Sequence, residues 1–263
     1  MIHHYTTIET LALILSNHKL RFSRLDKVDD IEESEFTSGP TKVRLGNYVF
    51  ASCWTRFDEE NISLWKMYSG YDGVRISLPE NDIFKAYNNY SGNCKFYFDK
   101  EVVAVGKDSV LCNIANPILC DDVVYTDDPN LLTKDIITAT DTHIKLNSSC
   151  AGKYKRKNWE FQKECRFKVI LYPMPEKVVA DIEKMDLYSQ LELSVKGIAY
   201  ILQQQRPISQ EYIDMPLSDT ALDHLQVMLG PKTSFAQEIL VKAVLNRFAP
   251  KAILEHSRLK IRK

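Results

Sequence analysis

Gln162, Glu164 and Arg166 stand two residues apart, and their side chains are the ones in this sequence best suited to do chemistry together. From Glu164 onward polar residues alternate with apolar ones, which predicts a strand over 162–172 that carries these three side chains on one face. A carboxylate beside an amide and a guanidinium can orient a hydroxylated, anionic ligand. The alternative interpretation is a solvated strand face that carries an exposed ion pair.

Further candidate residues come from distant parts of the chain. His4 follows His3 in a short apolar segment, and if this segment is a strand, one of the two rings points into the protein. Ser52 belongs to an apolar strand, and Trp65 and Tyr68 are three apart on a predicted helix. Each has a structural alternative, because a strand histidine or serine and a pair of helix aromatics also occur as packing residues.

Hydrophobic periodicity predicts interleaved strands and helices that would position these residues. The predicted strands cover 2–5, 20–23, 47–54, 74–78, 95–98, 102–105, 123–125, 162–172, 197–202 and 225–229, and a last strand contains Leu259 and Ile261. The predicted helices begin near Thr7, cover 62–68, 131–146 and 177–193, and run from a capping box at 234–237 to Pro250. No linker or repeat separates these elements, so we expect one α+β domain over 1–263, with a central mixed sheet flanked by helices.

The composition excludes several classes of protein and site. The 263 residues are 44% hydrophobic and carry a net charge of −1, which is typical of a soluble globular protein without a general attraction to nucleic acid. No apolar run approaches a membrane span and the N-terminus lacks the regions of a signal peptide, so we expect a cytoplasmic protein without a membrane partner. The six cysteines contain no Cys-x-x-Cys pair, and no metal site is expected.

The charges are unevenly distributed along the chain. Segment 26–35 holds six acids against Lys27 and shows no periodicity, which predicts a loop or a frayed helix. Segment 151–172 holds seven bases against Glu160 and Glu164. Solvated faces are the common explanation for such runs, and we interpret 153–157 as a solvated basic run. The functional alternative is a basic rim around a site for a phosphate-bearing ligand.

Short motifs succeed one another in a particular order along nearly the whole chain. They are His4-Tyr5-Thr6, 20–23, Asp30 with Glu33, Ser52, 64–68 leading into Gly73-Val74, Lys155 or Lys157 before Trp159-x-x-Gln162-x-Glu164-x-Arg166, 230–232 and 257–262. This order resembles a widespread bacterial family known as domain of unknown function 2971 (DUF2971). The sequence departs from the family's pattern in four places: Gln162 stands where Glu is more usual, Asp29 replaces Asn, Ile31 replaces Pro, and Cys53-Trp54 replaces Phe-Ser.

A looser resemblance suggests an activity. An early His, a hydroxyl or aromatic residue on the next core strands, and a later Gln-x-Glu strand look like the arrangement in mono-ADP-ribosyltransferases. This resemblance implies an ADP-ribosyltransferase-like fold with NAD as its substrate, Glu164 as the catalytic carboxylate beside the ribose, and Gln162 positioning the acceptor. It also implies a ribose contact for His4 and a ring from Tyr5 or Tyr68 that packs on nicotinamide.

The same resemblance assigns the pyrophosphate of NAD to Arg21, Arg166 or Lys232, whose cationic groups suit phosphate. Ser52 and Trp65 complete the set of candidate cofactor-binding residues. The implied chemistry is coherent, because a fixed carboxylate stabilises the positive charge that builds on ribose as the bond to nicotinamide breaks.

Two classes of function remain open. The first is an enzyme that splits NAD and releases ADP-ribose or transfers it to a nucleic acid or protein, and the resemblance implies a role as a toxin or phage-defence effector. The second is a non-catalytic sensor that binds a nucleotide or a phage component in the same pocket and acts through protein interaction. The sequence leaves the oligomeric state open.

Overall fold

The computed structural model of the protein describes residues 1–34, 36–38, 41–87, 97–113, 118–132, 137–139, 144–146 and 150–262. Within these ranges, nine strands form a central sheet in the order β16-β2-β5-β1-β6-β17-β18, with β14 and β9 joined to it through β5. Neighbouring strands are antiparallel except β17 and β18, which are parallel. The sheet is therefore mixed, and helices flank it as expected.

The strands of the central sheet are short. They are β1 (Ile2–Thr6), β2 (Lys19–Arg24), β5 (Val49–Thr55), β6 (Val74–Leu78), β9 (Cys120–Asp122), β14 (Glu164–Ile170), β16 (Tyr212–Pro216), β17 (Gln226–Leu229) and β18 (Ile253–His256). Four smaller pairings are described beside it: β3 (Phe36–Ser38) with β4 (Thr41–Val43), β10 (Val124–Tyr125) with β13 (Tyr154–Lys155), β11 (Ile137–Ala139) with β12 (Ile144–Leu146), and β15 (Tyr172–Pro173) with β8 (Ser109–Cys112) and β7 (Val102–Val105).

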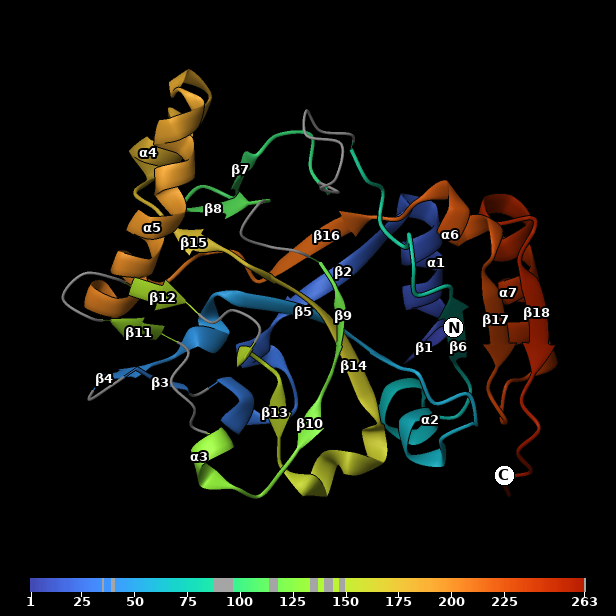
Figure 1. Ribbon diagram of the computed structural model, residues 1–263. Coiled ribbons are helices and arrows are strands. Elements are labelled where there is room, and N and C mark those ends of the chain that lie inside the picture. The colour runs from blue at the N-terminus through green and yellow to red at the C-terminus, as the bar shows by residue number, and fades with distance from the viewer. Residues whose placement is uncertain are drawn as a thin grey trace.

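The helices gather mainly at the two ends of the sheet. They are α1 (Ile8–Asn17), α2 (Ile62–Ser69), α3 (Pro129–Leu132), α4 (Glu176–Ala180), α5 (Leu187–Gln204), α6 (Asp219–Asp223) and α7 (Phe235–Phe248), with 3-10 turns at η1 (Leu25–Lys27), η2 (Ile31–Ser34), η3 (Leu45–Asn47), η5 (Lys157–Gln162) and η6 (Ile182–Lys184). Figure 1 shows α4 and α5 beside β7, β8 and β15 at one end, and α7 beside β17 and β18 at the other. A continuous core joins both ends, from Leu193 and Ile201 of α5 through Phe50 to Val241 of α7.

Capping residues begin several helices where the sequence predicts. Thr7 caps α1 by accepting a hydrogen bond from the backbone N–H of Thr10. Ser234 and Gln237 form the predicted capping box of α7. The predicted stop after α2 is also present, because Gly70 ends that helix in the left-handed conformation at φ 61°.

The centre of the fold is β5, since it links three other strands. One edge of β5 pairs with β14 along its whole length, which sets Cys53 opposite Arg166 and Thr55 opposite Glu164. The other edge pairs with β2 near Ala51 and with β1 only at Thr55. Between these two contacts, 52–54 have no strand partner on that edge in the described part of the chain. The strands β1 and β2 therefore diverge from one another in front of the middle of β5.

Several sequence predictions about secondary structure are wrong. Segment 131–146 is not one helix, since α3 ends at Leu132 and the described residues that come after it include the β11–β12 pair. Segment 197–202 is not a strand but the second half of α5, where Gly197 permits close packing: a Cβ there would lie 2.4 Å from the Cβ of Tyr172. The predicted helix over 177–193 is broken into α4, η6 and the start of α5.

Two more predictions need correction at the ends of segments. The last strand is β18, so Leu259 and Ile261 lie beyond it and outside any strand. In the predicted strand over 95–98, the first two positions lie outside the described residues, and 97–98 form no strand. Among the described helices, none combines the length and the apolar composition of a membrane span.

Candidate functional site

A cavity of about 270 Å³ lies where β1 and β2 diverge in front of β5. Both residues predicted to be catalytic, Gln162 and Glu164, line it. Six of the residues predicted to bind a cofactor also line it, namely His4, Tyr5, Arg21, Ser52, Tyr68 and Arg166. The fold thus brings to one cavity side chains that are distant in sequence, and a cavity of this kind is the usual form of a small-molecule site.

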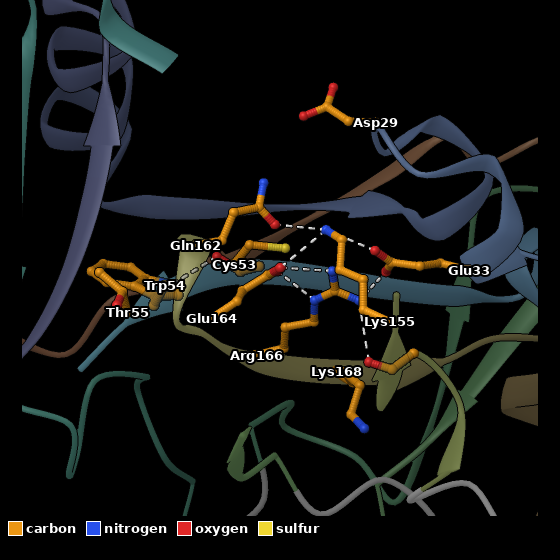
Figure 2. Close-up of polar contacts among 12 residues, drawn as sticks. Asp29, Glu33, Cys53, Trp54, Thr55, Lys155, Gln162, Glu164, Arg166 and Lys168 are labelled. Atoms are coloured by element: carbon orange, nitrogen blue, oxygen red, sulfur yellow. Dashed lines mark hydrogen bonds and ion pairs between the residues drawn. The ribbon is translucent and has the colours of Figure 1, made fainter. Parts of the chain in front are cut away.

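Lys155, Glu164 and Arg166 line the cavity and form a buried ion cluster with Glu33, which is not itself among the lining residues. Arg166 donates from Nε to Oε1 of Glu164 at 2.5 Å and from Nη2 to Oε2 at 2.9 Å, and its Nη1 pairs with Glu33. Lys155 Nζ lies 2.8 Å from Glu33 Oε1 and 3.3 Å from Glu164 Oε2. Figure 2 shows the four side chains converging, with Glu164 and Arg166 from β14, Lys155 from β13 and Glu33 from η2. The exposed fractions run only from 1% at Arg166 to 7% at Glu164, so solvent screens these charges little.

The cluster sets the protonation of its members. Burial alone would raise the pKa of Glu164, but the charge and hydrogen bonds of Arg166, together with Lys155, outweigh burial and lower the pKa to about 2. Burial likewise opposes the charge of Arg166, yet Glu164 and Glu33 raise the pKa of its guanidinium well above the ordinary value. Glu164 is therefore a carboxylate at neutral pH, held rigidly by two cations.

Gln162 reaches the cavity by a different route from the one that the sequence predicts. It ends the 3-10 turn η5, so it does not lie on β14. Lys163 comes next in the left-handed conformation at φ 45°, and this turn brings the side chain of Gln162 back beside Glu164. Gln162 Oε1 accepts from Lys155 Nζ at 2.8 Å, and Nε2 donates to the Tyr68 hydroxyl at 2.8 Å. Tyr68 in turn donates to Asp29 Oδ2 at 3.1 Å.

His4 links β1 to β5 at the wall of the cavity. Its Nδ1 lies 2.8 Å from the carbonyl oxygen of Cys53, in the part of β5 that lacks a strand partner on this edge among the described residues. Its ring lies against Trp54 at a centroid distance of 5.2 Å. Burial lowers the pKa of His4. His3 makes separate contacts, with Ser77 Oγ at 2.7 Å and Asp58 Oδ1 at 3.0 Å.

The remaining candidates divide between the cavity and other places. Ser52 is buried at the cavity wall, where its Oγ accepts from the indole N–H of Trp54 at 2.9 Å. Arg21 lies at the exposed rim and pairs with Asp214. Trp65 and Lys232 are not among the residues that line the cavity.

Trp65 is fully buried and packs edge-on against Tyr5 at 4.8 Å, so it is a core residue behind the cavity wall. Its indole N–H donates to Glu60. Lys232 lies outside the cavity, where its ammonium group is 5.1 Å from the ring centroid of Tyr71. Both residues were predicted to bind NAD because a cation and an aromatic ring suit this ligand. Residue type does not determine position in the fold, and neither residue lines the cavity.

Two members of the ion cluster were not predicted as site residues. Lys155 was interpreted as part of a solvated basic run, yet only 3% of it is exposed, and its ammonium group lies 4.6 Å from the ring centroid of Trp159. Glu33 appears in the acidic segment that was interpreted as a loop, but it is 2% exposed and contacts Arg166 across 133 positions of sequence. Both residues belong to the series of short motifs that resembles DUF2971. This series was the one feature of the sequence that singled them out.

The described residues contain no cluster of side chains that could hold a metal ion. Nowhere among these residues do three His, Cys, Asp or Glu side chains gather as a metal ion requires. The groups available to a ligand are cations, carboxylates, hydroxyls and aromatic rings. These groups suit a polar organic ligand that carries both a ring and negative charge.

Comparisons with known proteins do not test the resemblances to DUF2971 and to mono-ADP-ribosyltransferases, which stay predictions. No family model, curated protein or solved structure matches the chain. A function for the chain therefore rests on the geometry of the cavity and the chemistry of its residues.

Proposed function

We propose that this protein binds NAD in the cavity between β1 and β2 and acts as an ADP-ribosyltransferase-like enzyme, with Glu164 beside the ribose. The observation that carries the proposal is the position of Glu164: it lines the cavity as a carboxylate with a pKa of about 2, on a buried strand. A charge fixed in this way needs little reorganisation when positive charge builds on the ribose as nicotinamide leaves.

The rest of the cavity supports the same ligand. The rings of Tyr68, Trp54 and His4 offer surfaces for an aromatic base, and Arg21 with Lys27 offers cations for a pyrophosphate. Arg21 is half-exposed and its ion pair with Asp214 is a surface pair. The pair is bidentate and the guanidinium also lies 3.6 Å over the ring centroid of Tyr212, so a phosphate would compete with both contacts for Arg21.

The cavity has room for only part of a dinucleotide. Its volume of about 270 Å³ lies just below the range for ligand pockets, which is roughly 300–1,000 Å³. We therefore place the nicotinamide riboside half inside the cavity and the pyrophosphate at the rim near Arg21. An acceptor, whether nucleic acid or protein, would approach from the open side.

The second candidate function is a sensor that binds a nucleotide without cleaving it. The observation that favours it is the saturation of Glu164, since both of its carboxylate oxygens already accept from Arg166 or Lys155. Two adjacent cations weaken the stabilisation that this carboxylate can give to a third positive charge. A sensor would bind NAD or another nucleotide and release no nicotinamide.

The test is to incubate the purified protein with NAD and measure both binding, by calorimetry, and nicotinamide release, by chromatography. We expect release by the parent. Arg21→Met should raise KM about tenfold through loss of a phosphate contact, while Lys232→Met, a cation outside the cavity, should leave KM unchanged. Binding without nicotinamide release would favour the sensor. No binding, or equal effects of the two substitutions, would refute the proposed site.

A further inference from the structure

We infer that Gln162 and Asp29 form a donor–acceptor pair in the cavity, and that this pair selects a ligand group with a hydrogen-bond acceptor beside an N–H donor. Carboxamides have this pattern, and so does the amino edge of adenine. The inference rests on the proposed function and deepens it, because it names the part of the ligand that this side of the cavity recognises. Its test does not depend on NAD being cleaved.

The direction of each hydrogen bond is set by Lys155. An ammonium group can only donate, so the Gln162 atom that contacts Nζ at 2.8 Å is the amide oxygen. This contact fixes the orientation of the amide and removes its oxygen as an acceptor for a ligand. The amide nitrogen must then point the other way, and one of its two hydrogens is donated to the Tyr68 hydroxyl at 2.8 Å. One N–H of Gln162 remains for a ligand.

The next link runs from Tyr68 to Asp29. Burial, reinforced by the negative charge of Asp29, raises the pKa of Tyr68, so the phenol keeps its proton. The proton is donated to Asp29 Oδ2 at 3.1 Å, because the hydroxyl oxygen already accepts from Gln162. Asp29 makes no other hydrogen bond with the described residues, and its second oxygen therefore remains as an acceptor for a ligand.

The two groups are close enough to be used together. The distances of 2.8 Å and 3.1 Å through Tyr68 place Gln162 Nε2 within about 6 Å of Asp29 Oδ2. The acceptor that remains for a ligand is the other oxygen of this carboxylate, roughly 2 Å from Oδ2, so it lies within about 8 Å of the Gln162 donor. Both residues line the same cavity. In Figure 2 the amide nitrogen of Gln162 and the carboxylate of Asp29 lie on the same side of the ion cluster. A donor and an acceptor at this separation can meet the neighbouring acceptor and donor of one ligand edge.

The pair also rejects certain ligands. A group that offers an acceptor without the neighbouring N–H leaves the second oxygen of Asp29 without a partner, and a carboxylate at this position would meet the negative charge of Asp29. Unpaired polar groups are costly when a ligand covers them, so such analogues should bind more weakly. The pattern occurs at two places in NAD, namely the carboxamide of nicotinamide and the amino edge of adenine.

Matched pairs of small probes distinguish these two sources. Nicotinamide is compared with 3-acetylpyridine, and adenosine with purine riboside; in each pair the second compound keeps the acceptor but lacks the amino group. Binding is measured by ligand-observed NMR and calorimetry. We expect the parent protein to prefer the amino compound at least tenfold in one pair, and that pair identifies the source.

Variants show whether the preference comes from Asp29. Asp29 is exposed, so Asp29→Ala should fold, and it should reduce the preference to less than about twofold while Asp127→Ala, an exposed acid outside this cavity, should not change it. A purely structural role for Asp29 would weaken both compounds equally and would refute the inference. Equal binding of both compounds by the parent, or binding of none of the four, would refute it too. Nicotinamide release from NAD decides the proposed enzyme separately, so the two can fail independently.

Discussion

Arg166 holds Glu164 through two hydrogen bonds, although the two residues are only two apart on the same strand. Side chains at this spacing lie on one face, and here the long guanidinium folds back over the carboxylate. The two then behave as one neutral unit, which Glu33 and Lys155 extend from other parts of the chain. The position of the carboxylate in the cavity therefore depends on its partners in the cluster, including Glu33, which does not line the cavity.

Glu164→Gln should destabilise the fold as well as the proposed activity. The change leaves two buried cations with Glu33 as their remaining acid within the cluster, and breaking a buried pair in this way costs about 3–5 kcal/mol. Urea denaturation of the parent and the variant measures this loss. Glu160→Gln is the control, because it removes a nearby carboxylate that is more than half exposed, and it should change the free energy of unfolding by less than about 0.5 kcal/mol. Equal stability of Glu164→Gln and the parent would contradict the structural role.

The stability of the parent should depend on Glu164 at acid pH. Its pKa is about 2 in the folded protein against 4.5 as the ordinary value, so the folded state binds this proton more weakly than the unfolded chain does. The stabilisation is complete above pH 4.5 and is lost as the pH falls towards 2, with a total of about 3 kcal/mol. Urea denaturation at a series of pH values should show a slope in this window that is larger in the parent than in Glu164→Gln. Identical slopes would mean that another carboxyl is responsible.

Lys155→Met should lower the free energy of unfolding much more than expected for a lysine in a solvated basic run. The ammonium group is 3% exposed and contacts Glu33, Gln162 and Glu164, and its loss leaves two buried carboxylates to share Arg166. We expect a loss of about 3–5 kcal/mol in the free energy of unfolding. Lys157→Met is the matched control, since that side chain is 60% exposed, and it should unfold at nearly the same urea concentration as the parent.

His4 should be neutral at pH 7, with its proton on Nδ1. The nearest partner of Nδ1 is a carbonyl oxygen, which can only accept, and burial lowers the pKa of the ring below its ordinary 6.5. Nitrogen chemical shifts of labelled histidine should therefore show an unprotonated Nε2 and no titration between about pH 7 and 8. A protonated Nε2 in the neutral form would contradict the bond to Cys53. Because the folded ring resists charging, His4 should reduce stability as the pH falls below about 6.5.

The parts of the fold that the sequence predicted are those with a strong local signal. Strands such as β5 and β6 have uninterrupted apolar or alternating runs, and α1 and α7 have caps that mark their beginnings. Segment 197–202 was predicted wrongly because an apolar run of this length fits a strand or a buried helix equally well. Only contact with Tyr172 shows why Gly197 belongs inside a helix.

Most of the residues predicted for the site line the cavity, but the contacts among them were not predictable from the sequence. The types and order of His4, Ser52, Gln162 and Glu164 pointed to a common place, and the cavity contains all four. Their partners depend on tertiary contacts, and no local pattern distinguishes buried Lys155 from exposed Lys157 two positions later. For the same reason the sequence suggested an exposed Glu164–Arg166 pair as one alternative, whereas the pair is buried.

The left-handed residue Lys163 also bears on how this site could change over evolutionary time or under design. Lys163 separates Gln162 from β14, so the position of the Gln162 side chain is not fixed by the hydrogen-bond register of the sheet. Substitutions or small length changes in the turn before it can alter which group faces the ligand, while Glu164 and Arg166 keep their places opposite β5. One wall of the cavity can therefore acquire a new ligand preference without a new core.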